Sequence, residues 1–191
     1  ERAVIAAREG AIPFVLDPVG AGATRFRTDT VHRLLSKGAP SVIRGNASEI
    51  MSLHTSQGET KGVDSTERSR SALEAGRYLA KRHGCAVSIS GETDYLVSAD
   101  ERIAVSNGHF LMGRVTGMGC TASALTGAFL AVNPSALAAA AHAMAVMGIC
   151  GEMAAEKAAG PGSLQLRFLD ALYQLEKKQI EARLKVTHET L

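Results

Sequence analysis

The sequence has few cysteines, little net charge and no long run of strongly hydrophobic residues. Its three cysteines, Cys85, Cys120 and Cys150, are an odd number without paired spacing, which argues against a disulfide framework and favours a reducing compartment, the cytoplasm. The chain has 21 Lys and Arg against 19 Asp and Glu, and neither sign forms a long run, so nucleic acid is not an expected partner. The 46% hydrophobic content is that of a globular chain with an ordinary core.

A membrane span is not expected either. The most apolar stretch, SALAAAAHAMAVMGICGEMAA at 135–155, is mostly alanine and contains His142 and Glu152, which favours a buried helix. The first ten residues, ERAVIAAREG, form a helical pattern and lack the hydrophobic core and cleavage site of a signal peptide. Because the chain opens on Glu1, we expect it to begin inside a larger protein.

Short apolar runs alternate with helical patterns along the first half of the chain. We expect strands at 11–17, 40–46 and 85–90, helices at 1–10, 28–38, 46–54 and 67–84, and a polar loop at 55–66. Residues 93–116 contain three β-type runs separated by SADER and NG, as in antiparallel hairpins. From Thr116 onward we expect helices from about Cys120, over 135–150, and after GPGS with Ser163 as cap.

This element order predicts one domain over residues 1–191 with a three-layer α/β fold. The sheet should be mainly parallel and flanked by helices, with a small antiparallel region. In such sheets ligands bind beyond the carboxyl ends of the strands. Asp17, Asn46 and Ser90 all lie at predicted strand ends. We therefore expect these residues and the loop from Thr116 to meet at one rim.

One cysteine stands between a glycine pair and an apolar helical run, in TGMGCTAS at 116–123. Gly117 and Gly119 allow a tight turn, so the amides of Gly119, Cys120 and Thr121 should point out of the first helical turn and favour an anion. The same position should lower the pKa of the Cys120 thiol. The alternative is that the glycines form only a turn and that Cys120 is a small buried hydrophobic residue.

Other glycine and histidine motifs are weaker. GMGCTA fits the G-x-G-x-x-A dinucleotide fingerprint, but the region about 20 positions later, where an acidic residue is required, is an alanine-rich helical stretch. Neither this motif nor GAGAT at 20–24 is followed by Lys-Ser or Lys-Thr, which excludes a Walker A loop. The six histidines include no i, i+4 pair, so a zinc site is not expected.

Two carboxylates remain near the predicted rim. Asp17 is followed by the stiff turn at Pro18, while Glu49 stands three residues after Asn46 in a capping-box arrangement that requires no further function. If both carboxylates are functional, Asp17 and Glu49, with Asn46 through water, supply the oxygen ligands that Mg²⁺ accepts. Magnesium beside a helix-bound anion would indicate phosphate chemistry.

Seven motifs together resemble those of a known family. They are LDPVGAGATRFRT, IRGNASEI, KGVD, ISGETD, NGH, VTGMGCTASALTGAF and GPGS. In order and spacing they resemble the hydroxyethylthiazole kinases, a branch of the ribokinase-like fold, from Ile12 to about Leu175. The resemblance implies ATP-dependent, Mg²⁺-assisted phosphorylation of the hydroxyl of 4-methyl-5-(2-hydroxyethyl)thiazole in thiamine salvage, by a homotrimer with active sites at its interfaces.

The resemblance also implies roles for individual residues. Arg44, Ser90, Gly119 and Cys120 would contact ATP, and Gly117 would contact the thiazole. Many relatives have threonine where Ser90 stands, which keeps the hydroxyl. Cys120 takes the place of the aspartate base of most ribokinase-like enzymes, so it would lie beside the attacking hydroxyl while neighbouring amides hold the phosphoryl group.

The resemblance further places Asp17 and Glu49 around the magnesium ion, but two alternatives remain open. A ribokinase-like enzyme of the nicotinamide-nucleotide hydrate dehydratase type would normally keep aspartate where Cys120 stands. Family members also carry about another third of a chain before Glu1, with the first strands and part of the thiazole pocket. The chain would then be an inactive nucleotide-binding fragment, and its sheet would expose an apolar edge.

Overall fold

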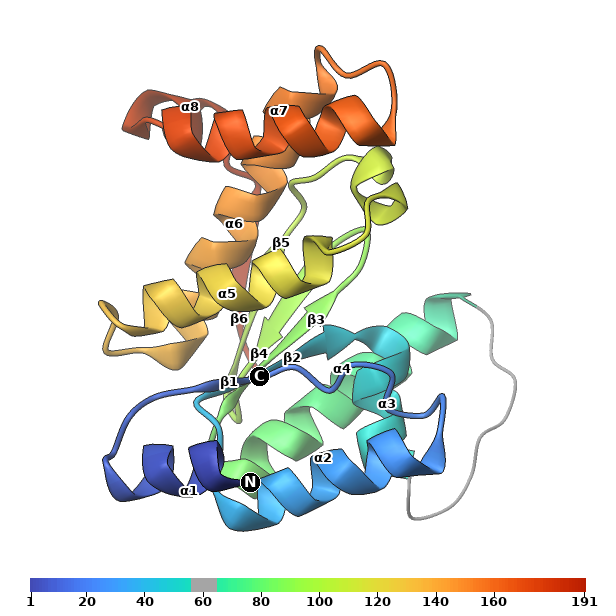
Figure 1. Ribbon diagram of the computed structural model, residues 1–191, viewed down its shortest axis with the longest axis vertical. Coiled ribbons are helices and arrows are strands. Elements are labelled where there is room, and N and C mark those ends of the chain that lie inside the picture. The colour runs from blue at the N-terminus through green and yellow to red at the C-terminus, as the bar shows by residue number, and fades with distance from the viewer. Residues whose placement is uncertain (56–64) are drawn as a thin grey trace.

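A six-stranded sheet with helices on both faces forms the core of the computed structural model, which describes residues 1–55 and 65–191 (Figure 1). Residues 56–64, with the KGVD motif and most of the predicted polar loop, lie outside this description. In sheet order, the strands are β1 (Val15–Leu16), β2 (Val42–Asn46), β3 (Ala86–Ser90), β4 (Asp94–Val97), β5 (Glu101–Val105) and β6 (Val186–Thr190).

The sheet is mixed. β1, β2 and β3 pair in parallel, whereas β4, β5 and β6 join them through antiparallel pairings. The predicted α/β class is therefore confirmed, but the expectation of a mainly parallel sheet is wrong, because β6 extends the antiparallel part. The sequence analysis does not predict β6, because all five of its residues are exposed and the strand has no buried apolar alternation.

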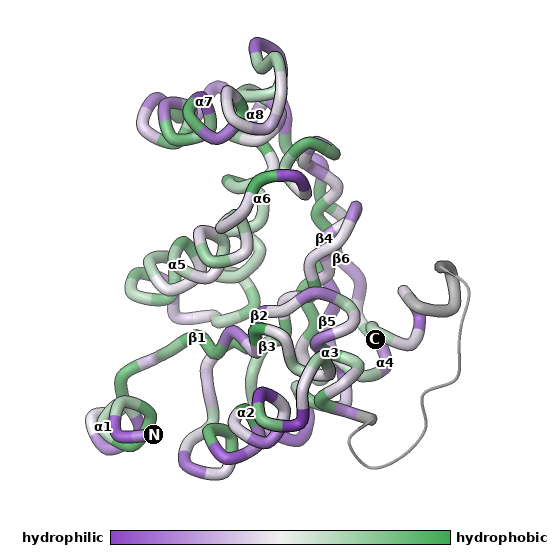
Figure 2. Tube along the Cα trace, turned by 45° about the vertical axis from the view of Figure 1, so that its right-hand side comes forward, coloured by the Kyte–Doolittle hydropathy of each residue, from purple (hydrophilic) through white to green (hydrophobic). Residues whose placement is uncertain are grey.

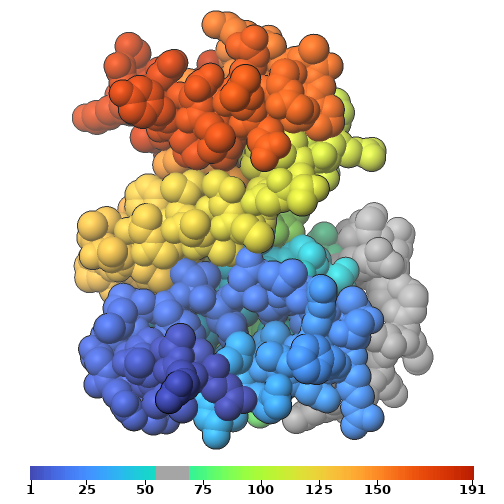
Figure 3. Space-filling view, viewed as in Figure 1, coloured from blue at the N-terminus to red at the C-terminus, as the bar shows by residue number. Residues whose placement is uncertain are grey.

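Helices from the two halves of the chain cover opposite faces of the sheet. The helices are α1 (Arg2–Glu9), α2 (Arg25–Lys37), α3 (Ala47–Thr55), α4 (Ser65–His83), α5 (Met118–Leu130), α6 (Ala136–Ala155), α7 (Pro161–Gln174) and α8 (Lys177–Arg183), with a 3-10 turn, η1, at Phe110–Arg114. Figure 3 shows the later helices stacked above the earlier ones.

Alternation along the strands separates two hydrophobic clusters. Val42 and Ala86 belong to a cluster with α5, α6 and α7, while their neighbours Ile43 and Val87 belong to one with α2, α3 and α4. Because successive strand side chains point to opposite faces, the central strands are buried on both sides. The three-layer prediction is confirmed.

The polypeptide at residues 135–155 forms the buried helix that the sequence predicts. Within the described residues one helix, α6, has the length and the apolar composition needed to cross a membrane. However, 67% of its most apolar 18-residue window is buried in the fold. Figure 2 shows α5 and α6 as largely hydrophobic segments. A helix that is apolar on all sides is expected where neighbours surround it.

Several predicted boundaries differ from the observed ones. α2 begins three residues earlier than expected because the Thr24 hydroxyl accepts a hydrogen bond from the Arg27 amide at 3.3 Å. α7 is capped at Gly160 rather than Ser163, although the Ser163 hydroxyl accepts from the Gly160 amide at 3.2 Å. The third predicted β-type run is the 3-10 turn η1, and its start is capped by the His109 side chain.

The first strand is shorter than predicted and lies at the edge of the sheet. Of the expected 11–17, only Val15–Leu16 pairs, and its partner is β2. Prolines flank it at Pro13 and Pro18, and a proline offers no amide to a neighbouring strand. Leu16 is buried whereas Val15 is partly exposed, as expected for a strand at the edge of the sheet.

Candidate active site

A cleft of about 970 Å³ opens at the carboxyl ends of β2 and β3, beside the start of α5. Arg44 from β2, Ser90 from β3 and Gly119 from α5 line it, together with the loop after β5, η1 and part of α6. A cleft of this size accommodates a small-molecule ligand such as a nucleotide. Ser90 and the loop from Thr116, both predicted to lie at the rim, therefore meet in this cleft, together with Arg44.

Arg44 connects the predicted residues to one another. Its Nη2 donates to the Ser90 hydroxyl at 2.8 Å, and its Nη1 lies 3.9 Å from Asp17 Oδ2. A Cβ at Gly119 would lie 2.8 Å from Nη1, so glycine allows the helix to approach the guanidinium. Arg44 is only 9% exposed, and its buried Nε has no hydrogen-bond partner within the described residues. The guanidinium is therefore fixed in position, while its Nε–H group remains an unused hydrogen-bond donor.

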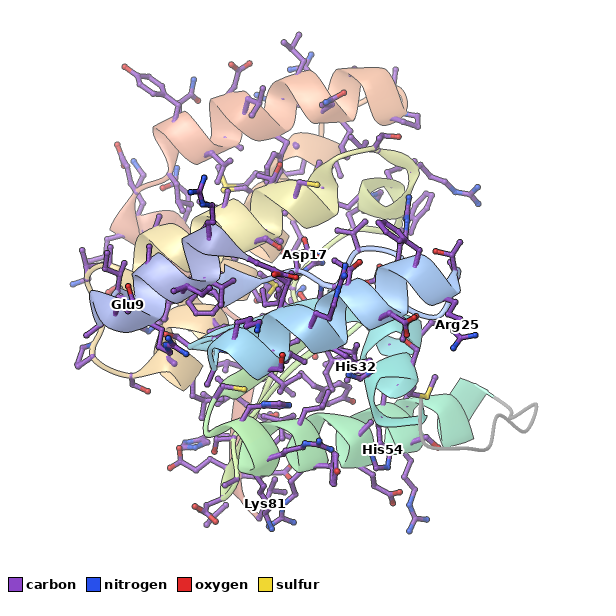
Figure 4. The ribbon with its side chains drawn as sticks, turned by 60° about the horizontal axis from the view of Figure 1, so that its bottom comes forward. Glu9, Asp17, Arg25, His32, His54 and Lys81 are labelled. Atoms are coloured by element: carbon purple, nitrogen blue, oxygen red, sulfur yellow. The ribbon has the colours of Figure 1, made fainter. Side chains whose placement is uncertain are left out.

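Asp17 points toward α5, as its position after β1 predicts. Its Oδ2 accepts a 2.6 Å hydrogen bond from the Ser123 hydroxyl on α5. Figure 4 labels Asp17 beneath this helix, near the middle of the molecule. The contact joins the end of β1 to α5 and leaves Oδ1 available for another ligand.

Glu49 forms the predicted capping box and one further contact. Its Oε2 accepts from the Asn46 amide and its own amide donates to Asn46 Oδ1, both at 2.9 Å. Its Oε1 accepts from the Gly20 amide at 2.9 Å, which ties the glycine turn after β1 to α3. Each carboxylate oxygen keeps a second lone pair, so the structural role does not exhaust its capacity.

The start of α5 carries the unpaired amides that the sequence predicts, shifted by one residue. Gly117 caps the helix with φ at +94°, a conformation that favours glycine, and α5 begins at Met118 rather than about Cys120. The Thr121 amide donates to the Gly117 carbonyl at 2.9 Å, so its expected availability is wrong. The amides of Met118, Gly119 and Cys120 are those that a first helical turn leaves without an i−4 partner.

Cys120 is exposed, whereas Cys85 and Cys150 are buried. Burial raises the pKa of Cys85 to about 12 and that of Cys150 to about 11, so neither buried thiol is reactive at neutral pH. The alternative in which Cys120 is a small buried hydrophobic residue is therefore wrong. It is the accessible thiol of the three.

The predicted residues divide between the cleft and the rim next to it. In the part of the chain that the structure describes, the cleft lining includes Arg44, Ser90 and Gly119. The other predicted residues lie outside that lining; they are Asp17, Asn46, Glu49, Gly117 and Cys120. Arg44 bridges the two groups through its contacts with Ser90 and Asp17.

Asp94 is a cleft residue that the sequence argument did not single out. It stands at the start of β4 in the ISGETD motif, lines the cleft and accepts from the Gly91 amide at 3.0 Å. Burial raises the pKa of Asp94 to about 6, although the Gly91 hydrogen bond and the Arg44 charge oppose this. The sequence did contain a signal for Asp94, because this carboxylate follows closely after Ser90, the residue that ends the buried strand β3.

Replacing Asp94 by asparagine should stabilise the protein at neutral pH. Because burial raises the folded pKa to about 6 from 3.8, the native state keeps a proton that the unfolded chain loses, and stability falls as pH rises through this window. Asparagine removes the buried charge and can still accept from Gly91. We expect Asp94→Asn to raise the free energy of unfolding by up to about 3 kcal/mol above pH 7 and by little below pH 4.

Urea unfolding of both proteins across pH 3.5 to 8 measures this difference at intervals of about half a unit. Asp100→Asn is the matched control, since Asp100 is exposed in the turn between β4 and β5. A stability difference that stays constant with pH would contradict the assignment.

Magnesium would require phosphate oxygens or water in addition to protein ligands. The described ranges contain no group of three or more His, Cys, Asp and Glu arranged to hold a metal ion. Mg²⁺ is commonly bound by one or two carboxylates together with substrate phosphates and water. Asp17 and Glu49 fit that pattern in keeping free lone pairs at the rim. The Arg44 charge, 3.9 Å from Asp17 Oδ2, opposes a cation there, so phosphate oxygens would have to supply the balancing negative charge.

The layered fold, the cleft at the carboxyl ends of the strands and the glycine-opened helix define an α/β protein with a small-molecule site at one edge of its sheet. Residues 1–178 match the model of the hydroxyethylthiazole kinase family. The chain belongs to this family.

Curated relatives share much of the sequence. Hydroxyethylthiazole kinase of Syntrophus aciditrophicus is 56% identical over 185 residues, which are 96% of this chain and 68% of that protein. Hydroxyethylthiazole kinase of Leptospira biflexa is 54% identical over 172 residues, 90% of this chain and 64% of that protein. The chain thus spans about two thirds of the length of these relatives.

Solved structures show the same fold. The hydroxyethylthiazole kinase of Pyrococcus horikoshii OT3 superposes with a TM-score of 0.89 at 38% identity, covering 98% of this chain and 70% of that one. A pyridoxal kinase of Staphylococcus aureus, in complex with AMP-PCP and pyridoxal, superposes with a TM-score of 0.64 at 19% identity and covers 100% of this chain and 69% of that one. The second likeness concerns the fold alone.

Proposed function

We propose that this chain transfers a phosphoryl group from ATP to the hydroxyl of 4-methyl-5-(2-hydroxyethyl)thiazole. The observation that carries the proposal is the buried Arg44 guanidinium, which joins Ser90, Asp17 and Gly119 at the start of α5. A cation, a helix N-terminus and a cleft of nucleotide size lie together there. Membership of the hydroxyethylthiazole kinase family supports the choice of substrate.

The residues divide the work in the following way. Arg44 and Ser90 bind the nucleotide in the cleft, and the amides of Met118, Gly119 and Cys120 hold the transferring phosphoryl group. Gly117 contacts the thiazole. Phosphoryl transfer has a loose transition state, so positioning and charge stabilisation by these groups contribute most of the rate.

Cys120 lies beside the attacking hydroxyl in this proposal and accepts its proton. Its exposure and its place in the first turn of α5 support that role. General-base assistance of this kind supplies a smaller part of the rate than the phosphate contacts do.

Asp17 and Glu49 would hold Mg²⁺, with Asn46 contributing through water. The bound ion would neutralise charge on the phosphate oxygens. Before any ion binds, Ser123 orients Asp17, and the amides of Gly20 and Asn46 orient Glu49.

We further propose one ribokinase-like domain over residues 1–191, in a cytoplasmic homotrimer that binds small molecules rather than nucleic acid or membranes. The near balance of 21 basic and 19 acidic residues supports the absence of a nucleic-acid partner. Apolar side chains exposed along α7 support self-association, namely Leu166, Leu169 and Tyr173.

ADP release in the presence of ATP, Mg²⁺ and the thiazole alcohol tests the proposed activity. Thiazole-dependent ADP formation is expected, and a phosphorylated thiazole should be recovered by mass spectrometry. Nicotinamide-nucleotide hydrate, supplied in place of the thiazole, tests the lyase alternative. ADP formation that is independent of the thiazole would contradict the proposal.

Nucleotide binding without turnover is the second candidate, favoured by the 64% to 68% of the relatives' length that the chain spans. ATP at 100 times its Kd would then stabilise the fold by about 2.7 kcal/mol while no ADP formed. Thermal unfolding with and without ATP tests nucleotide binding, and the absence of thiazole-dependent ADP formation distinguishes this candidate from the kinase.

A further inference from the structure

A polar cluster connects the end of the chain to the wall of the cleft. The Glu152 carboxylate on α6 uses Oε1 to accept from Lys185 Nζ at 3.0 Å, from Asn107 Nδ2 at 3.1 Å and from the Gly108 amide at 3.1 Å. The Glu152 side chain is 15% exposed. Three donors therefore converge on one partly buried oxygen.

Asn107 completes the cluster from the loop after β5. It is 3% exposed, its Nδ2 also donates to the Arg183 carbonyl at 2.8 Å, and its Oδ1 accepts from the Lys185 amide at 2.8 Å. Both ends of its amide group are thus bound to the end of α8 and the short segment that leads from it to β6. Asn107 and Gly108 line the cleft, so this segment contacts the cleft wall directly.

The loop also packs against α6 without intervening side chains. A Cβ at Gly148 would lie 2.5 Å from the Asn107 carbonyl oxygen, so only glycine permits this approach. Gly148 lines the cleft as well. The position of the wall is consequently determined by α6 on one side and by Lys185 and Arg183 on the other.

The charge on Glu152 is maintained by the same contacts. Burial alone would raise the pKa of Glu152, but the hydrogen bonds from Lys185, Gly108 and Asn107 and the Lys185 charge outweigh it and hold the pKa below its ordinary value. Charge-assisted hydrogen bonds of this kind are stronger than neutral ones, which suits a contact that must keep a loop in place.

We propose that Glu152 and Lys185 are positioning residues for the nucleotide, acting through the Asn107 and Gly108 wall of the cleft. The inference rests on the proposed function, because it takes the cleft to hold ATP. Lys185 lies beyond residues 1–178, the part matched by the family model, so the contact comes from this chain's own C-terminal segment. Without it, the loop would sample other positions and ATP binding would have to order it.

Lys185→Met tests the proposal because it removes the ammonium group and keeps the aliphatic stem. We expect about fivefold weaker ATP binding by calorimetry, a similar rise in KM for ATP, and kcat at saturating ATP within about twofold of the unmodified chain. Lys185→Arg should restore binding, and Glu152→Gln should weaken it as Lys185→Met does. Lys178→Met is the matched control, since Lys178 pairs with Glu176 at 2.7 Å in the same part of the chain.

Amide hydrogen exchange gives a readout that does not depend on ATP. Exchange at residues 106–109 should be at least about threefold faster in Lys185→Met, with other elements unchanged. Unchanged exchange there, acceleration spread over the whole fold, or unchanged ATP affinity would overturn the proposal. Failure of the unmodified chain to bind ATP would instead contradict the proposed function, while the exchange comparison would still decide whether Lys185 positions the loop.

Discussion

Cys120→Ala should lower kcat by about 10²–10⁴-fold without abolishing turnover, because a general base typically contributes that much. The α5 amides and Arg44 remain in the variant, so KM for ATP should change little. Cys120 is exposed and alanine is a strong helix former, so stability should change by less than about 0.5 kcal/mol. Steady-state ADP release with the thiazole alcohol measures the effect.

Cys120→Asp then distinguishes the role of the sulfur. Aspartate in the first turn of a helix is favourable, so the variant should fold and should retain activity if the residue acts as a base. Loss of activity would show that the site requires a neutral or polarisable group. Thr121→Ala is the matched control in the same turn, where only a 3.1 Å bond from the hydroxyl to the Gly117 carbonyl is removed. Wild-type kcat in Cys120→Ala would contradict the assignment of a base.

Arg44→Met should raise the Kd for ATP by about 100-fold, equivalent to about 2.7 kcal/mol, because a charged donor group facing the phosphates is lost. Stability should fall by a smaller amount, about 1 kcal/mol, because the hydrogen bond to Ser90 and the charge that favours the Asp94 carboxylate are lost. The contact with Asp17 contributes less, since 3.9 Å is too long for a hydrogen bond. Asp17 keeps its hydrogen bond from Ser123, so its carboxylate is not left without a partner.

Calorimetry with ATP and Mg²⁺, together with urea unfolding, separates the two effects. Arg44→Lys keeps the charge without the planar fork and should give intermediate affinity. Arg77→Met is the matched control, because Arg77 on α4 donates to the Ala99 carbonyl at 3.0 Å and does not line the cleft. Unchanged ATP affinity in Arg44→Met, or a stability loss as large as the affinity loss, would contradict the role given to Arg44.

Features that depend on neighbouring residues were predictable. The capping box of Asn46 and Glu49 and the glycine that opens α5 follow from residues three or fewer positions apart. The alternation of buried strands with helices is likewise local in origin, since it requires only the correct periodicity. The placement of Asn46 beside Ser90 follows from a general property of parallel strands, whose carboxyl ends share one edge.

Features that depend on distant partners were not predictable. β6 carries no apolar alternation and exists because β5 offers it an edge. Residues 109–116 have a β-like composition, yet their central part, Phe110–Arg114, forms η1. It packs closely on α6, because a Cβ at Gly151 would overlap the Met112 sulfur. Asp94 and Glu152 look like ordinary acidic residues until their surroundings are known.

The sequence by itself determined the α/β class, the rim residues and the family, because spacing, capping and motif order are written along the chain. The tertiary structure decided that the sheet is mixed, that Arg44 joins the rim to the cleft, and that Lys185 reaches the wall of the cleft. The physical reason is that burial and long-range hydrogen bonds fix the charge and position of a side chain, and both are properties of groups far apart in sequence.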